Sequence, residues 1–139
     1  MHLSLIDYSE HYFTNIKKIE MPTKRSGKFI QILNEAEERE YLVLSPRELG
    51  AYHANVVERF CLLQAINGSY HNDKKHYFEI HDPVWTIVGG GVWAINEITK
   101  TLTLSGSSQG YGFFEARGLK EKLSSSALVS GYTIKIDGR

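Results

Sequence analysis

The sequence contains very little cysteine and no long run of apolar residues. Its one cysteine, Cys61, excludes an internal disulfide and is typical of proteins kept in a reducing, intracellular compartment. No stretch approaches the roughly 20 apolar residues that a membrane span needs. The segment Met1–Asp7 lacks the basic start and long apolar run of a signal peptide. The sequence therefore predicts a soluble, cytoplasmic protein without a membrane partner.

An excess of charge of one sign is also missing. Lys plus Arg and Asp plus Glu both number 16, so the formal net charge is zero. Nucleic-acid-binding modules usually carry a basic excess, so we expect no nucleic acid partner. A hydrophobic fraction of 42% and a length of 139 residues are ordinary for one globular domain. We therefore expect a single domain over residues 1–139.

Seven runs rich in β-branched and aromatic residues, two of them on either side of one glycine triplet, predict about six strands. These runs lie at residues 28–33, 41–44, 77–80, 84–88, 92–95, 100–104 and 132–136. The triplet Gly89-Gly90-Gly91 separates two of them, and glycines inside a strand mark a bulge or a close approach to the backbone. Residues 1–27 form the least regular part. Strands outnumber helices without strict alternation, which favours an α+β fold.

Two helices are expected. Ser45-Pro46-Arg47-Glu48 is typical of a helix start, with Ser45 as cap and Glu48 completing an S-x-x-E capping box. One helical face follows, formed by Leu49, His53, Val56, Phe60 and Leu63. Asn67-Gly68 is a natural stop. The second helix is predicted over residues 113–124.

His53 lies on the apolar face of the first predicted helix, about one turn inside it. One interpretation is a core histidine satisfied by one hydrogen bond. The other is a nucleophile or a general acid or base. Spacing alone favours the first. Cys61 lies off this face and is predicted to be a small core residue.

The loop from Gly106 to Gly112 contains three glycines and two serines and is predicted to run directly into the second helix. Backbone N–H groups and the helix dipole at such a place favour an anion, although a plain flexible connection is the alternative. No G-K-[ST] follows, so this is not a P-loop. The glycine triplet fails G-x-G-x-x-G, so no dinucleotide cofactor is expected.

Two other kinds of site have weak support. His71, His76 and His81 are spaced by five near Asp73 and Asp82. That spacing does not place side chains on one helical face, and no H-E-x-x-H accompanies it, so solvated loop histidines are favoured over a metal site. A Ser/His/Asp triad has no G-x-S-x-G elbow to support it.

Four pieces in this order together resemble the phosphohistidine phosphatase (Janus/Ocnus) family. They are Ala51-Tyr52-His53-Ala54-Asn55, the glycine triplet, the loop Gly106–Gly112, and the closing helix and strand. The resemblance covers roughly residues 28–137, with a longer region at 67–82. It implies a mixed β-sheet flanked by two helices, and metal-free, cofactor-free hydrolysis of the N–P bond of phosphohistidine.

The resemblance also implies roles for particular residues. The essential histidine of the family falls on His53, which would attack the phosphoryl group or activate water. The lysine of its first strand falls on Lys28, and its phosphate loop falls on Ser108 and Gly110, with Ser107 adjacent. The implied partner is a phosphohistidine-bearing protein or peptide, or inorganic phosphate.

Two positions depart from the family pattern. Val92 follows the glycine triplet where the family has an arginine, and Ser45 stands in place of a second arginine. Arg47, two residues on, is the candidate replacement ligand for phosphate. Losing a planar, bidentate phosphate ligand is not a conservative change. A binding module that keeps the anion pocket without turnover is therefore the second functional hypothesis.

A third hypothesis is an interaction protein without an anion site. It would use exposed aromatic side chains such as Trp85, Trp93 and Tyr70. Single exposed aromatic residues are common on protein surfaces, so they support this hypothesis only weakly.

Overall fold

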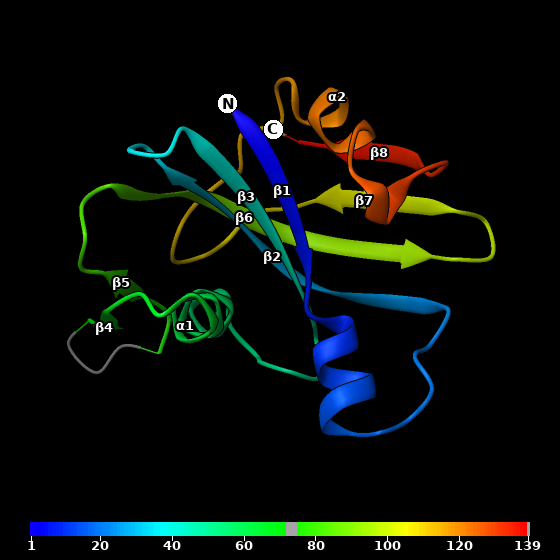
Figure 1. The fold of residues 1–139 in the computed structure, drawn as a ribbon, viewed down its shortest axis with the longest axis horizontal. Coiled ribbons are helices and arrows are strands. Elements are labelled where there is room, and N and C mark those ends of the chain that lie inside the picture. The colour runs from blue at the N-terminus through cyan, green and yellow to red at the C-terminus, as the bar shows by residue number, and fades with distance from the viewer. Residues whose placement is uncertain (72–74, 139) are drawn as a thin grey trace.

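The computed structural model describes residues 1–71 and 75–138 and is built on a curled, mixed six-stranded sheet (Figure 1). Its strands lie in the order β1-β3-β2-β6-β7-β8. They are β1 (His2–Asp7), β2 (Lys24–Asn34), β3 (Arg39–Pro46), β6 (Trp85–Asn96), β7 (Thr101–Ser105) and β8 (Thr133–Asp137). A small second sheet pairs β4 (Gly68–Tyr70) with β5 (Phe78–Ile80). The expected α+β architecture is confirmed.

The sheet is antiparallel in its centre and parallel at its two edges. β2 pairs antiparallel with β3 and with β6, and β6 pairs antiparallel with β7. The edge strands β1 and β8 run parallel to β3 and β7. This combination makes the sheet mixed, as expected.

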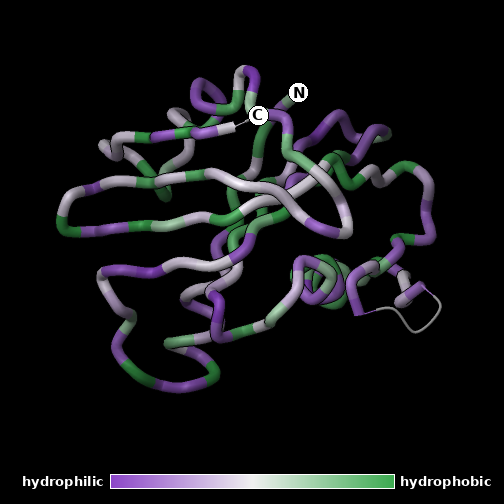
Figure 2. The backbone as a smooth tube through the Cα atoms, turned by 180° about the vertical axis from the view of Figure 1, so that it is seen from behind, coloured by the Kyte–Doolittle hydropathy of each residue, from purple (hydrophilic) through white to green (hydrophobic). Residues whose placement is uncertain are grey.

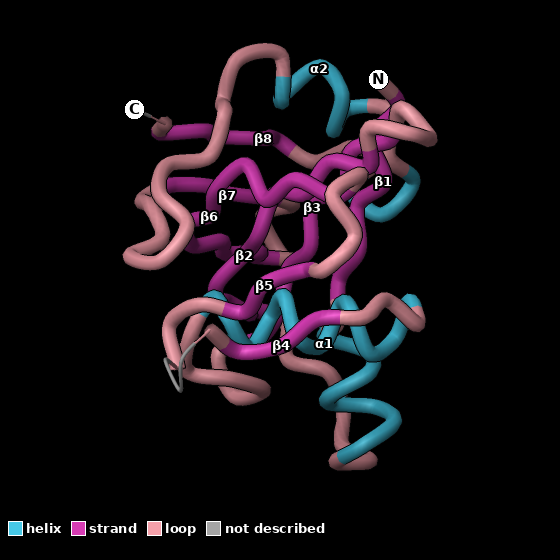
Figure 3. Tube along the Cα trace, turned by 90° about the vertical axis from the view of Figure 1, so that its left-hand side faces the viewer, coloured by secondary structure: helices cyan, strands magenta, loops and turns pink. Residues whose placement is uncertain are grey.

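Helices cover the two faces of the sheet. Figure 3 shows α1 (His53–Gln64) with the small sheet at one side of the main sheet and α2 (Leu119–Ser124) at the other. Two short elements, η1 (Glu10–Ile16) and η2 (Ala127–Val129), complete the fold. None of the helices described is long and apolar enough to cross a membrane.

Alternation along the strands divides the core into two apolar clusters, because neighbouring side chains point to opposite faces. Phe29 belongs to the cluster under α2, and Ile30 to the cluster under α1. Figure 2 shows hydrophobic stretches gathered where the central strands overlap. The face under α1 is the one that carries the candidate site.

The first predicted helix begins later than expected. Pro46 pairs with Gly27 in the sheet and Ser45 pairs with Lys28, so the predicted cap is part of β3. α1 begins only at His53. Strand pairing satisfies the backbone of Ser45 better than a cap could, and the capping-box prediction is therefore wrong.

Three further boundaries also differ. Residues 1–27 contain β1 and η1, because parallel pairing with β3 stabilises a strand whose own sequence pattern is weak. α1 ends at Gln64, Ala65 after it has a left-handed φ of 56°, and Gly68 starts β4. Residues 113–118 are not helical, since α2 begins at Leu119 after Gly118 with a φ of 75°.

The glycine triplet lies inside β6, which continues through it as one strand. A Cβ atom on Gly89 would collide with the carbonyl group of Phe113, and one on Gly91 would collide with the carbonyl oxygen of Ser105. The prediction of a close backbone approach is therefore confirmed at these two positions.

Trp93 joins three strands from within the core. Its side chain is 2% exposed, and its indole N–H donates to the carbonyl oxygens of Lys28 (3.1 Å) and Ser45 (2.9 Å). We predict that Trp93→Phe lowers the free energy of unfolding by about 1–3 kcal/mol, because buried carbonyl groups lose their donor. Denaturant unfolding monitored by circular dichroism measures this change.

Trp85→Phe is the matched control for that measurement. Trp85 packs against Tyr41 and Phe60, and its indole N–H makes no hydrogen bond within residues 1–71 and 75–138. Trp85→Phe should lower the free energy of unfolding by less than Trp93→Phe does. Equal costs would contradict the assigned role of the Trp93 indole.

Candidate functional site

Four separate segments line a pocket of about 300 Å³ beside the first turn of α1. We call it the phosphate pocket. Its lining residues are Lys28, Ala51, Tyr52, His53, His76, Ser107, Ser108, Gln109 and Gly110. The structure thus brings together every residue that the resemblance matched to the family site. None of the lining residues is acidic, and Lys28 is a cation, so the pocket suits an anion.

His53 is the first residue of α1, and its ring is fixed against β6. The side-chain Nε2 lies 2.8 Å from the carbonyl oxygen of Gly91, so it carries the proton and donates. A Cβ atom on Gly90 would lie 2.9 Å from the ring carbon Cδ2, which shows how closely strand and ring pack. In the neutral ring, Nδ1 therefore carries the free lone pair. No hydrogen bond to Nδ1 is found among the described residues.

The surroundings of His53 favour its neutral form. Burial lowers the pKa of His53 below the ordinary value of 6.5, and the nearby Lys28 cation lowers it further. The hydrogen bond to the Gly91 carbonyl acts in the opposite direction but is the smaller effect. At neutral pH the Nδ1 lone pair is therefore present, as a nucleophile or a general base requires.

Side chains around the start of α1 explain why the helix begins at His53. Tyr52 is extended, and its N–H donates to Oδ1 of Asn55 (2.9 Å). The Asn55 amide donates to the Tyr70 hydroxyl (3.0 Å), which donates to Glu58 (2.7 Å). Burial and Glu58 raise the pKa of Tyr70 to about 12, so it remains a donor. Asn55 therefore both caps the helix and ties it to β4.

The loop Gly106–Gly112 presents hydrogen-bond donors to the phosphate pocket. Ser108 and Gly112 bond each other through both backbone N–H groups, at 2.9 and 2.8 Å. The Ser108 hydroxyl accepts the N–H of Tyr111 (3.1 Å), which leaves its own proton to donate. Within the described ranges, the N–H groups of Gln109 and Gly110 make no hydrogen bond. The N–H groups of Gln109 and Gly110 can therefore donate hydrogen bonds to the oxygens of an anion.

The expectation that this loop runs directly into a helix is wrong. α2 begins seven residues after Gly112, so the dipole of α2 does not act at the loop. Phe113 instead forms a parallel bridge with Gly90. Tertiary contact with β6 keeps this segment extended although its composition permits a helix.

The connection between α1 and β6 supplies a wall that sequence reasoning missed. The Tyr111 hydroxyl accepts the N–H of Phe78 (2.7 Å) and donates to its carbonyl oxygen (2.8 Å), which attaches β5 to the phosphate loop. The His76 ring meets the Tyr52 ring edge-on at 4.7 Å. His76 is exposed, as predicted for a loop histidine, yet it lines the phosphate pocket. No spacing signal in the sequence indicates this.

The other histidines of this region lie outside the pocket lining. His81 contacts the hydroxyl of Ser69 at 2.9 Å, and Asp73 lies outside the described residues. Among the residues described, no three His, Cys, Asp or Glu side chains gather as a metal site would require.

Cys61 is confirmed as a core residue. It is 2% exposed in the cluster under α1, and burial raises its thiol pKa to about 11. A thiol in that state is not a nucleophile at neutral pH.

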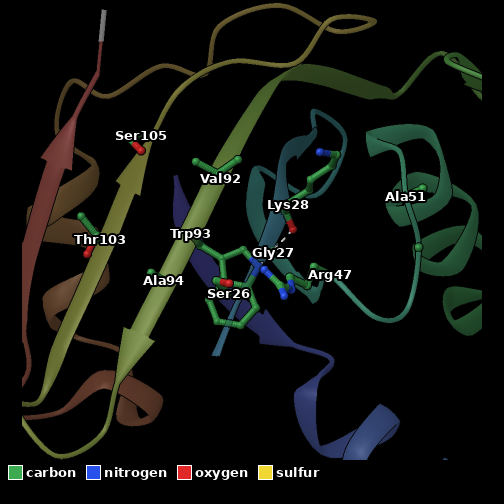
Figure 4. Close-up of a pocket in the computed structure, with 11 residues that line it drawn as sticks. Ser26, Gly27, Lys28, Arg47, Ala51, Val92, Trp93, Ala94, Thr103 and Ser105 are labelled. Carbon is green, nitrogen blue, oxygen red and sulfur yellow. Dashed lines mark hydrogen bonds between the residues drawn. The ribbon is translucent and has the colours of Figure 1, made fainter. Parts of the chain in front are cut away.

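A second pocket of about 500 Å³ adjoins the first one and shares Lys28 and Ala51 with it (Figure 4). We call it the side pocket. Arg47 lines the side pocket and does not line the phosphate pocket. Val92, which stands where the resemblance calls for an arginine, also lines the side pocket.

The prediction that Trp93 is exposed is wrong, and the three named aromatic residues give little support to an interaction surface. Trp93 is buried, and Trp85 and Tyr70 are only partly exposed. Tyr70 packs edge-on against Phe78 at 5.1 Å, and Trp85 lies 5.6 Å from the Phe60 ring. Tyr70 and Trp85 therefore pack against the apolar cluster under α1.

No protein-family model matches the chain, and no curated protein matches it either.

We predict that the pKa of His53, measured by NMR titration of its ring protons, lies below 6.5. Lys28→Gln should raise this pKa, because removing a nearby cation makes the imidazolium less unfavourable. Lys135→Gln, at an exposed position on β8, is the control and should leave it unchanged. A pKa at or above 6.5 that ignores Lys28 would contradict this description of the site.

Proposed function

We propose that this protein hydrolyses the N–P bond of phosphohistidine in proteins or peptides, with His53 as the reacting group. The main observation behind this proposal is the free lone pair on Nδ1 of His53. The hydrogen bond from Nε2 to the carbonyl oxygen of Gly91 leaves Nδ1 unprotonated, and His53 lines one pocket with Lys28 and the Ser108 loop. The resemblance of the same residues to phosphohistidine phosphatases supports the proposal.

The geometry suits a two-step reaction. Nδ1 of His53 attacks phosphorus, a new N–P bond forms, and the N–P bond of the substrate breaks. Water then adds to phosphorus, loses a proton to a base and releases phosphate, and His53 leaves as the neutral ring. In a one-step reaction the same lone pair removes the proton of the attacking water. Both routes need the neutral Nδ1.

Lys28 and the hydrogen-bond donors of the loop are suited to stabilise the negative charge on the phosphoryl oxygens. A cation and convergent N–H and O–H groups stabilise charge that spreads over these oxygens in the transition state. The Ser108 hydroxyl and the N–H groups of Gln109 and Gly110 are the available donors. No metal ion takes part in this scheme.

His76 is suited to handle the proton of the leaving group. The substrate imidazole departs as a strongly basic anion unless its nitrogen is protonated. His76 lines the pocket, is exposed to solvent and has its ring held against Tyr52. We propose that it gives a proton to the departing nitrogen and takes one back from the water of the second step.

A non-catalytic phosphopeptide-binding module is the second candidate. The observation that favours it is Val92, because no guanidinium follows the glycine triplet and Lys28 is the one lysine or arginine among the residues that line the phosphate pocket. Such a module would bind phosphate through Lys28 without turning over a substrate.

Phosphate release from a phosphohistidine peptide tests the proposal. We predict that His53→Ala lowers kcat by about 10²-fold or more, as loss of a nucleophile or general base does. His81→Gln, outside the pocket lining, is the control and should keep full activity. Equal, negligible rates for wild type and His53→Ala would exclude the enzyme. Phosphate binding that Lys28→Gln weakens would then identify the binding module.

We predict that His76→Gln slows hydrolysis of the phosphohistidine peptide by about 10²-fold, the usual contribution of a general acid. Hydrolysis of p-nitrophenyl phosphate should change little, because its leaving group is a weak base and needs no proton. Comparing kcat of the two substrates measures the difference. An equal loss on both substrates would show that His76 only shapes the pocket.

A further inference from the structure

The side pocket lies on a part of the main sheet that α1 leaves uncovered. Register places Lys28 beside Val92 and Val92 beside Ser105, so their side chains form one row across β2, β6 and β7. A second row, one alternation further along the strands, consists of Ser26, Ala94 and Thr103. Figure 4 shows Val92 between Lys28 and Ser105. The floor of this pocket is therefore made of small side chains on a rigid sheet.

The side pocket is bordered by two cations, Lys28 and Arg47. None of its lining residues is acidic. Lys28 and Arg47 make no ion pair within the described part of the chain. Arg25, by contrast, pairs with Asp7 at 3.6 Å and with Glu97 at 2.7 Å. Two unpaired cations at one pocket favour an anionic ligand.

The backbone that carries the two cations is held in place. The Trp93 indole fixes the carbonyl oxygens of Lys28 and Ser45, as described above. The N–H of Arg47 donates to the carbonyl oxygen of Ser26 at 3.0 Å. A backbone held in this way loses little freedom when a ligand binds, which favours affinity.

The floor of the side pocket suits the aliphatic part of an acidic side chain, and the cations beside the floor suit its charge. Val92 is 43% exposed although it lies on a strand in the interior of the sheet, and Ala94 is exposed beside it. An arginine after the glycine triplet would extend over this floor. Val92 leaves the space open, and an apolar floor with cations at its side fits the methylenes and carboxylate of a glutamate.

We propose that the side pocket is a subsite for an acidic residue next to the phosphohistidine of the substrate, with Arg47 binding its carboxylate. This inference rests on the proposed function and names the substrate sequence that this site prefers. The shared wall of Lys28 and Ala51 places the two pockets side by side. Successive residues of an extended peptide lie about 3.5 Å apart, so a neighbouring residue reaches the side pocket while the phosphoryl group occupies the first.

A binding experiment tests the subsite without depending on turnover. The probes are two fluorescent peptides that carry phosphoryltriazolylalanine, a stable mimic of phosphohistidine, flanked on both sides by two Glu or by two Gln residues. Fluorescence anisotropy at low salt should give a Kd about two- to fivefold lower for the Glu peptide, the size expected for one partly exposed charge pair. Arg47→Gln should bring the ratio of the two Kd values close to one.

Arg117→Gln is the matched control, since it removes the same charge from an exposed arginine of another surface pocket. It should keep the preference for the Glu peptide. Equal Kd values for the two peptides with wild-type protein would overturn the subsite, as would a preference that survives Arg47→Gln or disappears with Arg117→Gln.

The same experiment separates failure of the subsite from failure of catalysis. A Glu preference that depends on Arg47, in a protein that releases no phosphate, would support the subsite and identify a binding module. Turnover of phosphohistidine peptides without any Glu preference would support the enzyme and reject the subsite. Absence of binding to either peptide, together with no release of phosphate, would reject both the subsite and the proposed function.

Discussion

The close approach of α1 to the glycine triplet of β6 is the contact on which the candidate site depends. The ring of His53 lies so near Gly90 that a side chain there would meet it, and Nε2 of the ring donates to the carbonyl oxygen of Gly91. One hydrogen bond therefore sets the tautomer of the ring, and the backbone of a central strand sets its position. Burial at this place lowers the pKa of His53 by more than the hydrogen bond to Gly91 raises it, which favours a neutral ring with a free Nδ1. A longer side chain at Gly90 would remove both properties together.

The rest of the phosphate pocket is assembled around this contact from distant parts of the chain. The Ser108 loop is closed by its own backbone bonds to Gly112 and is attached to β5 through Tyr111 and Phe78. That attachment places the segment carrying His76 against the loop and against Tyr52. The connection between α1 and β6 thus acts as a structural part of the site. It also introduces a titratable group that the resemblance to phosphohistidine phosphatases does not supply.

Charge is distributed unevenly over the two pockets. Lys28 borders both, whereas Arg47 borders only the side pocket, where Val92 leaves the floor open. Val92 stands where the resemblance calls for a guanidinium, and Arg47 borders the adjoining pocket instead. Under the proposed function, Lys28 would bind the phosphoryl group and Arg47 would contact a neighbouring residue of the substrate.

The sequence by itself determined which residue types the site contains and most of the central strands, because strand periodicity and glycine content are local properties. The strands at 28–33 and 100–104 and the burial of Cys61 follow from that local pattern. Only the tertiary structure decided where α1 begins, since pairing of Ser45 with Lys28 outweighs a capping box that looks favourable locally. It also decided that Trp93 is buried, that residues 113–118 are not helical, and that His76 and Arg47 border different pockets. Those outcomes depend on partners far away in the sequence, whose contacts no local pattern records.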